Sequence, residues 1–130
     1  MSTLYDMFAE WIDRQLEENT MPESTVSFCF NLYNESDGSF GMQLTACDRF
    51  DESDQDWACY HVYLDEDNIF RIKGDNDEEN EWENAYAFMK GLAVTYLEKG
   101  KHRDILLDTK GVGIGHVNGD LELLYIQKHS

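Results

Sequence analysis

Apolar residues near the start of the chain recur at the three- to four-residue spacing of one helix face. They are Leu4, Met7, Phe8, Trp11 and Leu16. Thr3, followed three positions later by Asp6, resembles the capping box that begins many helices. The spacing predicts a helix over residues 3–19.

After Pro22 the apolar positions alternate with polar ones, which is the pattern of a strand with one buried face. Residues 26–32 and 40–46 both alternate, and the sequence NESDGS between them is typical of a turn, so they predict an antiparallel hairpin. Aromatic and β-branched residues are frequent over 57–64 and 69–72, where two further strands are expected. A meander of these strands is the simplest arrangement.

A second helical stripe follows in the middle of the chain, and it consists of Trp82, Ala85, Tyr86, Met89, Ala93, Tyr96 and Leu97. Asn80 and Glu83 can cap the start of this helix, and Gly100 stands where a left-handed C-cap belongs. Positive charge at a helix C-terminus complements the helix dipole, which is the expected role of Lys99, Lys101, His102 and Arg103.

The sequence GVGIGHVNGDLELLYIQ, residues 111–127, combines alternating glycines with an Asn-Gly pair. Asn-Gly favours a two-residue hairpin turn, which would pair Val112 with Tyr125 and Ile114 with Leu123. The glycines would then form a bare strip on the opposite face, where a helix or another backbone can approach closely. The glycines would face Glu122, Leu124 and Ile126.

A phosphate-binding loop is the alternative interpretation of these glycines. Such a loop needs a helix directly after the glycine-rich turn, and none is predicted here. Asp120 and Glu122 would also repel a phosphate. The segment is therefore expected to be a terminal hairpin.

These elements predict one α+β domain over residues 1–130. We expect a mostly antiparallel sheet of about six strands with the N-terminal and central helices packed on one face, and a C-terminal β-hairpin.

Composition narrows the possible partners. Ten Lys and Arg residues against 27 Asp and Glu give a formal charge of −17, which repels nucleic acids and anionic membranes and attracts basic proteins. The N-terminus is acidic and lacks the apolar segment of a signal peptide, so a cytoplasmic protein is expected. Cys29, Cys47 and Cys59 are expected to be reduced, buried thiols.

No motif in the sequence predicts catalysis, a cofactor or a metal site. Cys59 and His61 resemble half of a zinc site, but no second pair stands at ligand spacing. The acidic segment that begins at Asp75 lacks the glycine and the final glutamate of a calcium-binding EF-hand loop. A cysteine nucleophile with a distant histidine stays open, since such groups assemble in space, but nothing in the pattern favours it.

The acidic residues themselves are the candidate binding site for a basic protein partner. Opposite charge speeds encounter and rejects wrong partners, whereas the simpler alternative is a solvated loop. Trp57 or Phe50 is expected to add an exposed aromatic anchor. The predicted partner-binding residues are Asp51, Glu52, Asp54, Asp56, Trp57, Asp75, Asp77, Glu78 and Glu79.

The sequence YLEKGKHRDILLDTKGVGIGHVNGDLELLYI, residues 96–126, resembles the small acidic immunity proteins of bacterial polymorphic and contact-dependent inhibition toxin systems. The shared residues are structural: a cap glycine, a hairpin turn and core positions. The resemblance implies a protein that binds a cognate toxin domain, often a nuclease with a basic cleft, and blocks it without chemistry of its own.

Two other functions stay open. The first is a small enzyme or ligand-binding domain with a pocket between the central helix and the sheet, lined by Trp82, Tyr86, Tyr60 or His61. The second is a general acidic regulator that imitates DNA and binds many basic proteins with little discrimination.

Overall fold

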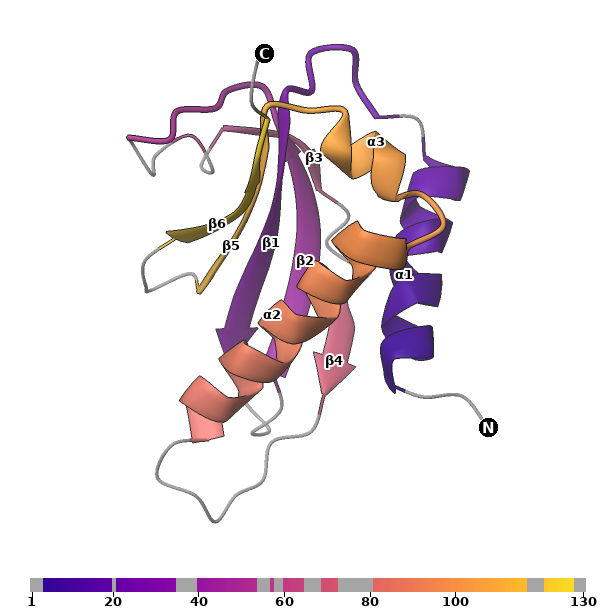
Figure 1. The fold of residues 1–130 in the computed structure, drawn as a ribbon, viewed down its shortest axis with the longest axis vertical. Helices are drawn as coiled ribbons and strands as arrows, with labels where there is room; N and C mark the ends of the chain where they lie inside the picture. Colours follow the sequence, from indigo (N-terminus) through magenta and orange to yellow (C-terminus); the bar gives the residue numbers. More distant parts are fainter. Residues whose placement is uncertain are drawn as a thin grey trace.

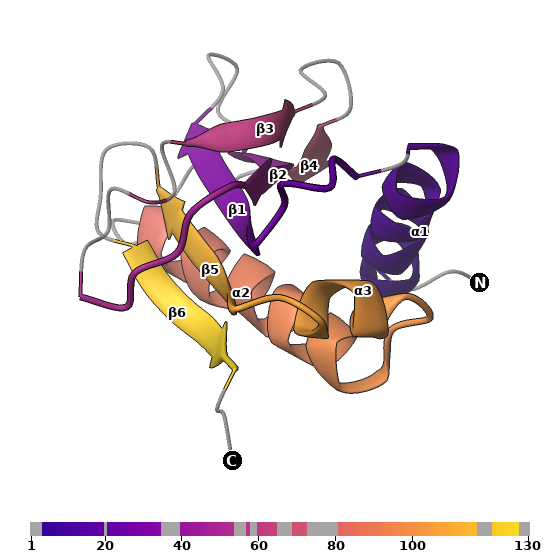
Figure 2. The same cartoon turned by 90° about the horizontal axis from the view of Figure 1, so that it is seen from above.

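The computed structural model describes residues 4–19, 21–34, 40–53, 57, 60–64, 69–72, 81–116 and 121–127. Its helices lie on one side of a curved sheet (Figures 1 and 2). They are α1 (Leu4–Glu18), α2 (Glu81–Lys99) and α3 (Arg103–Leu107). Among the described residues, no helix combines the length and the apolar character needed to cross a bilayer.

The predictions of the N-terminal and central helices are confirmed. The Tyr96 carbonyl oxygen accepts a hydrogen bond from the Gly100 N–H (2.7 Å). The predicted left-handed conformation of Gly100 is wrong; glycine is needed there because a Cβ atom would lie 2.6 Å from the ring of Tyr96. The sequence did not predict α3, because its five residues are too few to show a periodic apolar stripe.

The sheet has the α+β arrangement that the sequence predicts. Its strands follow the order β3-β2-β1-β5-β6, with β4 also paired to β2. All neighbours are antiparallel except β1 and β5, which are parallel. The strands are β1 (Ser27–Asn34), β2 (Phe40–Cys47), β3 (His61–Leu64), β4 (Phe70–Ile72), β5 (Gly111–His116) and β6 (Leu121–Ile126).

The predicted four-strand meander is wrong. β3 pairs with Thr45 to Cys47, and β4 pairs with Phe40 to Met42, so both lie along the same edge of β2. The physical reason is length: β2 has eight residues, whereas β3 has four and β4 has three. Two short strands therefore fit end to end beside one long strand.

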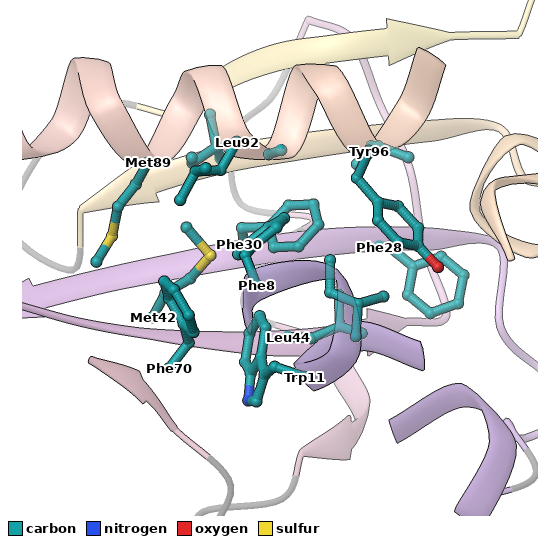
Figure 3. Packing of buried hydrophobic residues seen from close by; sticks show 14 of the residues in the cluster. Phe8, Trp11, Phe28, Phe30, Met42, Leu44, Phe70, Met89, Leu92 and Tyr96 are labelled. Carbon is teal, nitrogen blue, oxygen red and sulfur yellow. The ribbon is translucent and has the colours of Figure 1, made fainter. Parts of the chain in front are cut away.

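One face of the sheet and the helices enclose the main hydrophobic core. Phe28, Phe30 and Leu32 alternate along β1 and are at most 2% exposed. In Figure 3 the side chains of Met89, Leu92 and Tyr96 point from α2 toward the sheet, and Phe8 and Trp11 of α1 complete the cluster. Phe8 meets Phe70 edge to face with ring centroids 5.3 Å apart. Each fully buried large side chain contributes roughly 1.5–3 kcal/mol.

The register of the terminal hairpin is only partly as predicted. Val112 pairs with Tyr125 as expected, but the predicted pairing of Ile114 with Leu123 is wrong. An irregularity after Val112 places Leu123 opposite Gly113, so the two strands are offset by one residue from there on. Because successive side chains alternate between faces, this offset turns Leu123 toward the glycine side of the sheet. The predicted turn at Asn118 and Gly119 lies outside the described residues.

Candidate functional site

The acidic loop, as we call the segment from Asp48 to Tyr60, connects β2 to β3. Its ends are joined by a backbone hydrogen bond in which the Asp48 N–H donates to the Tyr60 carbonyl oxygen (3.1 Å). The Tyr60 N–H donates to the Trp57 carbonyl oxygen (3.2 Å), and the Ser27 hydroxyl donates to the Arg49 carbonyl oxygen (2.7 Å). Surface loops with adjoining ends and internal packing are compact and frequently functional. This loop is therefore tied to β1 as well as to its own base.

Trp57 is buried, with only 3% of its surface exposed, so the prediction that it is an exposed anchor for a partner is wrong. Its ring lies 5.1 Å from that of Phe50. Figure 2 shows the segment 48–53 on the side of the sheet opposite the helices. There Trp57 packs with Phe50 and with Cys29, Cys47, Leu121 and Leu123. Its indole fixes the acidic loop to the sheet instead of presenting a surface.

The glycines of β5 explain why Trp57 can lie there. A Cβ atom at Gly113 would stand 3.2 Å from Cζ2 of Trp57 and 3.1 Å from Cδ1 of Leu121, tighter than ordinary contact. A Cβ atom at Gly111 would overlap the ring of Phe50. At Gly111 and Gly113 the bare strip predicted from the sequence thus receives the aromatic rings of Phe50 and Trp57.

With Phe50 and Trp57 packed against the sheet, the described part of the acidic loop presents two carboxylates to solvent. Asp51 and Glu52 are exposed, and neither forms an ion pair with a residue in the described part of the chain. Asp51 Oδ1 accepts a hydrogen bond from the Ser53 N–H (2.8 Å), which stabilises a local turn. Asp48 differs from them, because its Oδ1 lies 3.6 Å from Nε of Arg49. The free negative charge of the described loop is therefore at Asp51 and Glu52.

A hollow of about 330 Å³ separates these carboxylates from the ends of β5 and β6. Its lining combines two acids, one base, one amide and two apolar side chains, namely Asp51, Glu52, Lys110, Gln127, Phe50 and Ile126. An aromatic ring and carboxylates together suit a cationic side chain, which gains from both. The sequence did not reveal this hollow, because its members come from three separate segments.

The remaining predicted binding residues lie outside the described part of the chain. They are Asp54, Asp56, Asp75, Asp77, Glu78 and Glu79. Whether they join Asp51 and Glu52 in one surface stays a prediction.

The prediction of a pocket between the central helix and the sheet is wrong for those of its lining residues that the structure describes. Tyr60 and His61 lie at the β3 end of the strand order and are exposed. Tyr86 of α2 lies instead beside β6, where its hydroxyl donates to Glu122 Oε1 (3.0 Å). The side chain of Trp82 is outside the described residues. These side chains therefore do not converge on one cavity.

Glu122 is neutralised on the helical side of the sheet. Its carboxylate accepts hydrogen bonds from the Lys90 ammonium and from the Tyr86 hydroxyl. The hydrogen bond from Lys90 is the main cause that lowers the pKa of Glu122. Burial, together with the hydrogen bond to Glu122, raises the pKa of Tyr86 to about 12. Glu122 therefore contributes little free charge for a partner.

A second polar cluster joins α1 to the turn between α2 and α3. The Tyr96 hydroxyl donates to Asp13 Oδ1 (2.5 Å) and accepts from the His102 N–H (3.0 Å). Glu17 Oε2 lies 2.7 Å from Nε2 of His102 and 3.2 Å from Nζ of Lys101. The bases at the end of α2 thus meet a carboxylate of α1 in addition to the helix dipole. Tyr96 is fully buried, so the cluster is a structural tether.

The described residues contain no group of three or more His, Cys, Asp or Glu side chains placed to hold a metal ion. Cys29 and Cys47 are buried and form no disulfide bond, as predicted. Cys59, the other half of the zinc-like pair with His61, is outside the described residues.

A groove of about 550 Å³ runs between α1 and the outer side of α2. Nζ of Lys99 lies 4.9 Å from the ring centroid of Tyr5 at this groove. Phe88, also in its lining, is 44% exposed. The groove lies on the helical side of the molecule, away from the acidic loop (Figure 2).

A scan against protein-family models, a search of curated proteins and a search of solved structures each found no match for this chain.

Proposed function

We propose that the protein binds a basic partner, a bacterial toxin domain such as a nuclease, and neutralises it by covering its active site. The resemblance of residues 96–126 to immunity proteins supports this function. The observation that carries it is the acidic loop, which holds Asp51 and Glu52 outward on a buried aromatic anchor. Such a protein acts in the cytoplasm and needs neither a cofactor nor a catalytic group.

The packing of Phe50 and Trp57 affects affinity, because a loop must adopt one conformation when it binds a partner. A mobile loop loses conformational freedom when it docks, and that loss weakens affinity. Here the aromatic rings of Phe50 and Trp57 already hold the loop in place before any partner arrives. The carboxylates of Asp51 and Glu52 can therefore act as a preorganised negative surface.

A nuclease cleft is a positive trough that holds phosphates. A chain with a formal charge of −17 is attracted to such a trough over long distances, and its carboxylates can take the place of the phosphates. Inhibition would then be steric and electrostatic, with no bond made or broken.

The test is a capture experiment followed by an activity titration. The tagged protein is incubated with a lysate of its native host and washed at about 0.5 M salt, where exposed charge pairs are strongly screened. We expect one stoichiometric partner, whose toxic activity falls to zero when equal amounts of the two proteins are mixed. A scatter of basic proteins that all leave in salt would contradict the proposal and favour a general DNA mimic.

A small-ligand-binding function is the second candidate, because of the groove between α1 and α2. Its lining joins the apolar side chains of Phe88 and Leu92 to the polar groups of Tyr5, Thr95 and Lys99, a mixture found in ligand sites. A ligand bound there would raise the melting temperature as its concentration increases. Substitution of Thr95 by Val would abolish that rise if the groove is the site.

A further inference from the structure

β6 is the last strand of the sheet on the side away from β3 (Figures 1 and 2). No described strand pairs with its outer edge. The Gln127 N–H donates to the Lys110 carbonyl oxygen (2.9 Å), on the β5 side. Because hydrogen bonding alternates along an antiparallel strand, the N–H and C=O of Ile126 point outward. This edge therefore offers backbone groups to another extended chain.

The two edges of the sheet differ in how well they can accept such a chain. The edge at β2 is occupied by β3 and β4, which have only four and three residues. β6 has six residues, and its sequence, LELLYI, contains no Pro or Lys. The extra residue of its bulge is Leu124, so the pairing with β5 is regular from Tyr125 to Gln127, beside the hollow. Proline, lysine, very short strands and β-bulges are common devices that prevent pairing at sheet edges. β6 has only a bulge, at Leu124, and its residues beside the hollow lie beyond that bulge.

The acidic hollow lies at the C-terminal end of this same edge. Ile126 contributes to its lining together with Phe50, Asp51 and Glu52. A strand placed beside β6 would carry its side chains past Ile126 and into the hollow. Lys110 also lines the hollow and offsets the charge of one carboxylate, so two acids and one base leave a single net negative charge. This charge and the aromatic ring fit one lysine or arginine side chain.

We propose that the partner docks by adding a basic extended segment to the outer edge of β6, with a Lys or Arg side chain in the acidic hollow. This inference rests on the proposed function, since it specifies how the basic partner is held. Backbone hydrogen bonds would supply much of the affinity, and the hollow would supply selectivity for a basic residue.

A second copy of the chain is the competing occupant of the edge. Two copies would bring together molecules with a formal charge of −17 each, which repel one another. Charge complementarity therefore favours a basic segment. Sedimentation measurements decide this point, because a dimer that dissociates when the Ile126 N–H is removed in Ile126→Pro would overturn the proposal.

The probe for strand addition is a capped synthetic heptapeptide of alternating valine and arginine. Two derivatives carry N-methyl groups, one on every valine amide and the other on every arginine amide, so each derivative blocks one edge of the peptide strand. We expect the parent peptide to slow amide exchange at Ile126. One derivative should bind at least about tenfold more weakly than the parent, and the other should bind about as well. The two derivatives should differ because a strand that adds to a sheet forms backbone hydrogen bonds along only one of its two edges.

Each outcome separates the docking mode from the proposed function. Equal binding by all three peptides would mean that charge alone attracts them; strand addition would fail while the acidic surface remained. Absence of any effect on the β6 amides would also overturn strand addition, whatever the capture experiment gives. A heptapeptide with glutamate in place of arginine should not bind, and its binding would contradict the role of the hollow.

Variants of the hollow complete the test. Asp51→Asn with Glu52→Gln should weaken the parent peptide about tenfold, because both carboxylates beside the bound cation are lost. The matched control removes the same charge elsewhere, by Glu98→Gln with Asp104→Asn, on the helical side. Equal weakening by both double variants would show that only net charge matters and would overturn the assignment to the hollow.

Discussion

Gly113 lies beneath the indole of Trp57, and the missing side chain lets the ring pack on the sheet. The alternating glycines were visible in the sequence, but their partner was not, because Trp57 stands more than fifty positions away. The pattern therefore predicted a bare strip without the residue that fills it. The prediction that Trp57 is exposed was wrong for the same reason. It was based on the acidic residues next to Trp57 in the sequence, because the glycines that it packs against are distant.

Gly113→Val is expected to displace Trp57. The new side chain would require the indole or Leu121 to move, and overpacking of this kind destabilises proteins by roughly 1–3 kcal/mol. Urea unfolding would measure the loss, and the fluorine NMR signal of a labelled Trp57 would report the displacement. Gly91→Ala is the control, since a Cβ atom there meets nothing within 4 Å and should stabilise α2 by roughly 0.5–1 kcal/mol. An unchanged Trp57 signal in Gly113→Val would contradict the close packing.

Tyr96→Phe tests the buried hydroxyl that joins α1 to α3. The substitution removes one hydrogen bond to Asp13 and one from the His102 N–H, so we expect a loss of about 1–3 kcal/mol in the free energy of unfolding. Tyr60→Phe removes the same atom from an exposed ring and should change stability by less than about 0.5 kcal/mol. Equal effects in the two variants would argue against the tether.

At the scale of elements, the apolar period predicted the two long helices and both hairpins, since these depend on neighbouring residues. The pairing of β1 with β5 could not be predicted in this way, because it joins segments with α2 and α3 between them. Strand order is decided by how the helices cover the sheet, and a single sequence carries little local signal for it. The offset in the terminal hairpin was missed too. Five of the six residues of β6 are apolar, so its sequence does not show where the bulge changes the face of each side chain.

The ion pairs between α1 and the start of α3 predict how stability depends on pH. The hydrogen bond with His102, followed by the one with Lys101, lowers the pKa of Glu17 below its ordinary value of 4.5. A lowered folded-state pKa contributes stability that is present above the unfolded value and is lost as pH falls through the folded one. Wild type should therefore exceed Glu17→Gln in stability at pH 7. The difference should disappear below the folded pKa of Glu17, and urea titrations across this range would detect it.

A gap between wild type and Glu17→Gln that persisted unchanged into strong acid would contradict the assignment of this stability to the carboxylate. Glu18→Gln is a suitable control, since Glu18 is exposed at the end of the same helix and has no ion pair with a described residue. Its effect on stability should be small at every pH.

At the scale of the whole molecule, 27 acids against ten bases make repulsion within the chain a large unfavourable contribution. The long-range part of this repulsion is screened by salt, whose Debye length falls to about 8 Å at 0.15 M. We therefore expect the melting temperature to rise by about 3 °C or more between low salt and 0.3 M NaCl. A melting temperature that fell over this range would mean that attractive ion pairs outweigh the repulsion.

The central claim is that Asp51 and Glu52, held by the buried Trp57, form the surface that meets a basic partner. The most direct test is the association rate of the captured partner with wild type, with Asp51→Asn/Glu52→Gln and with the charge-matched Glu98→Gln/Asp104→Asn. We predict that the first double variant slows association about tenfold at low salt and flattens its salt dependence, while the control stays close to wild type. Equal rates for the two double variants at every salt concentration would contradict the claim.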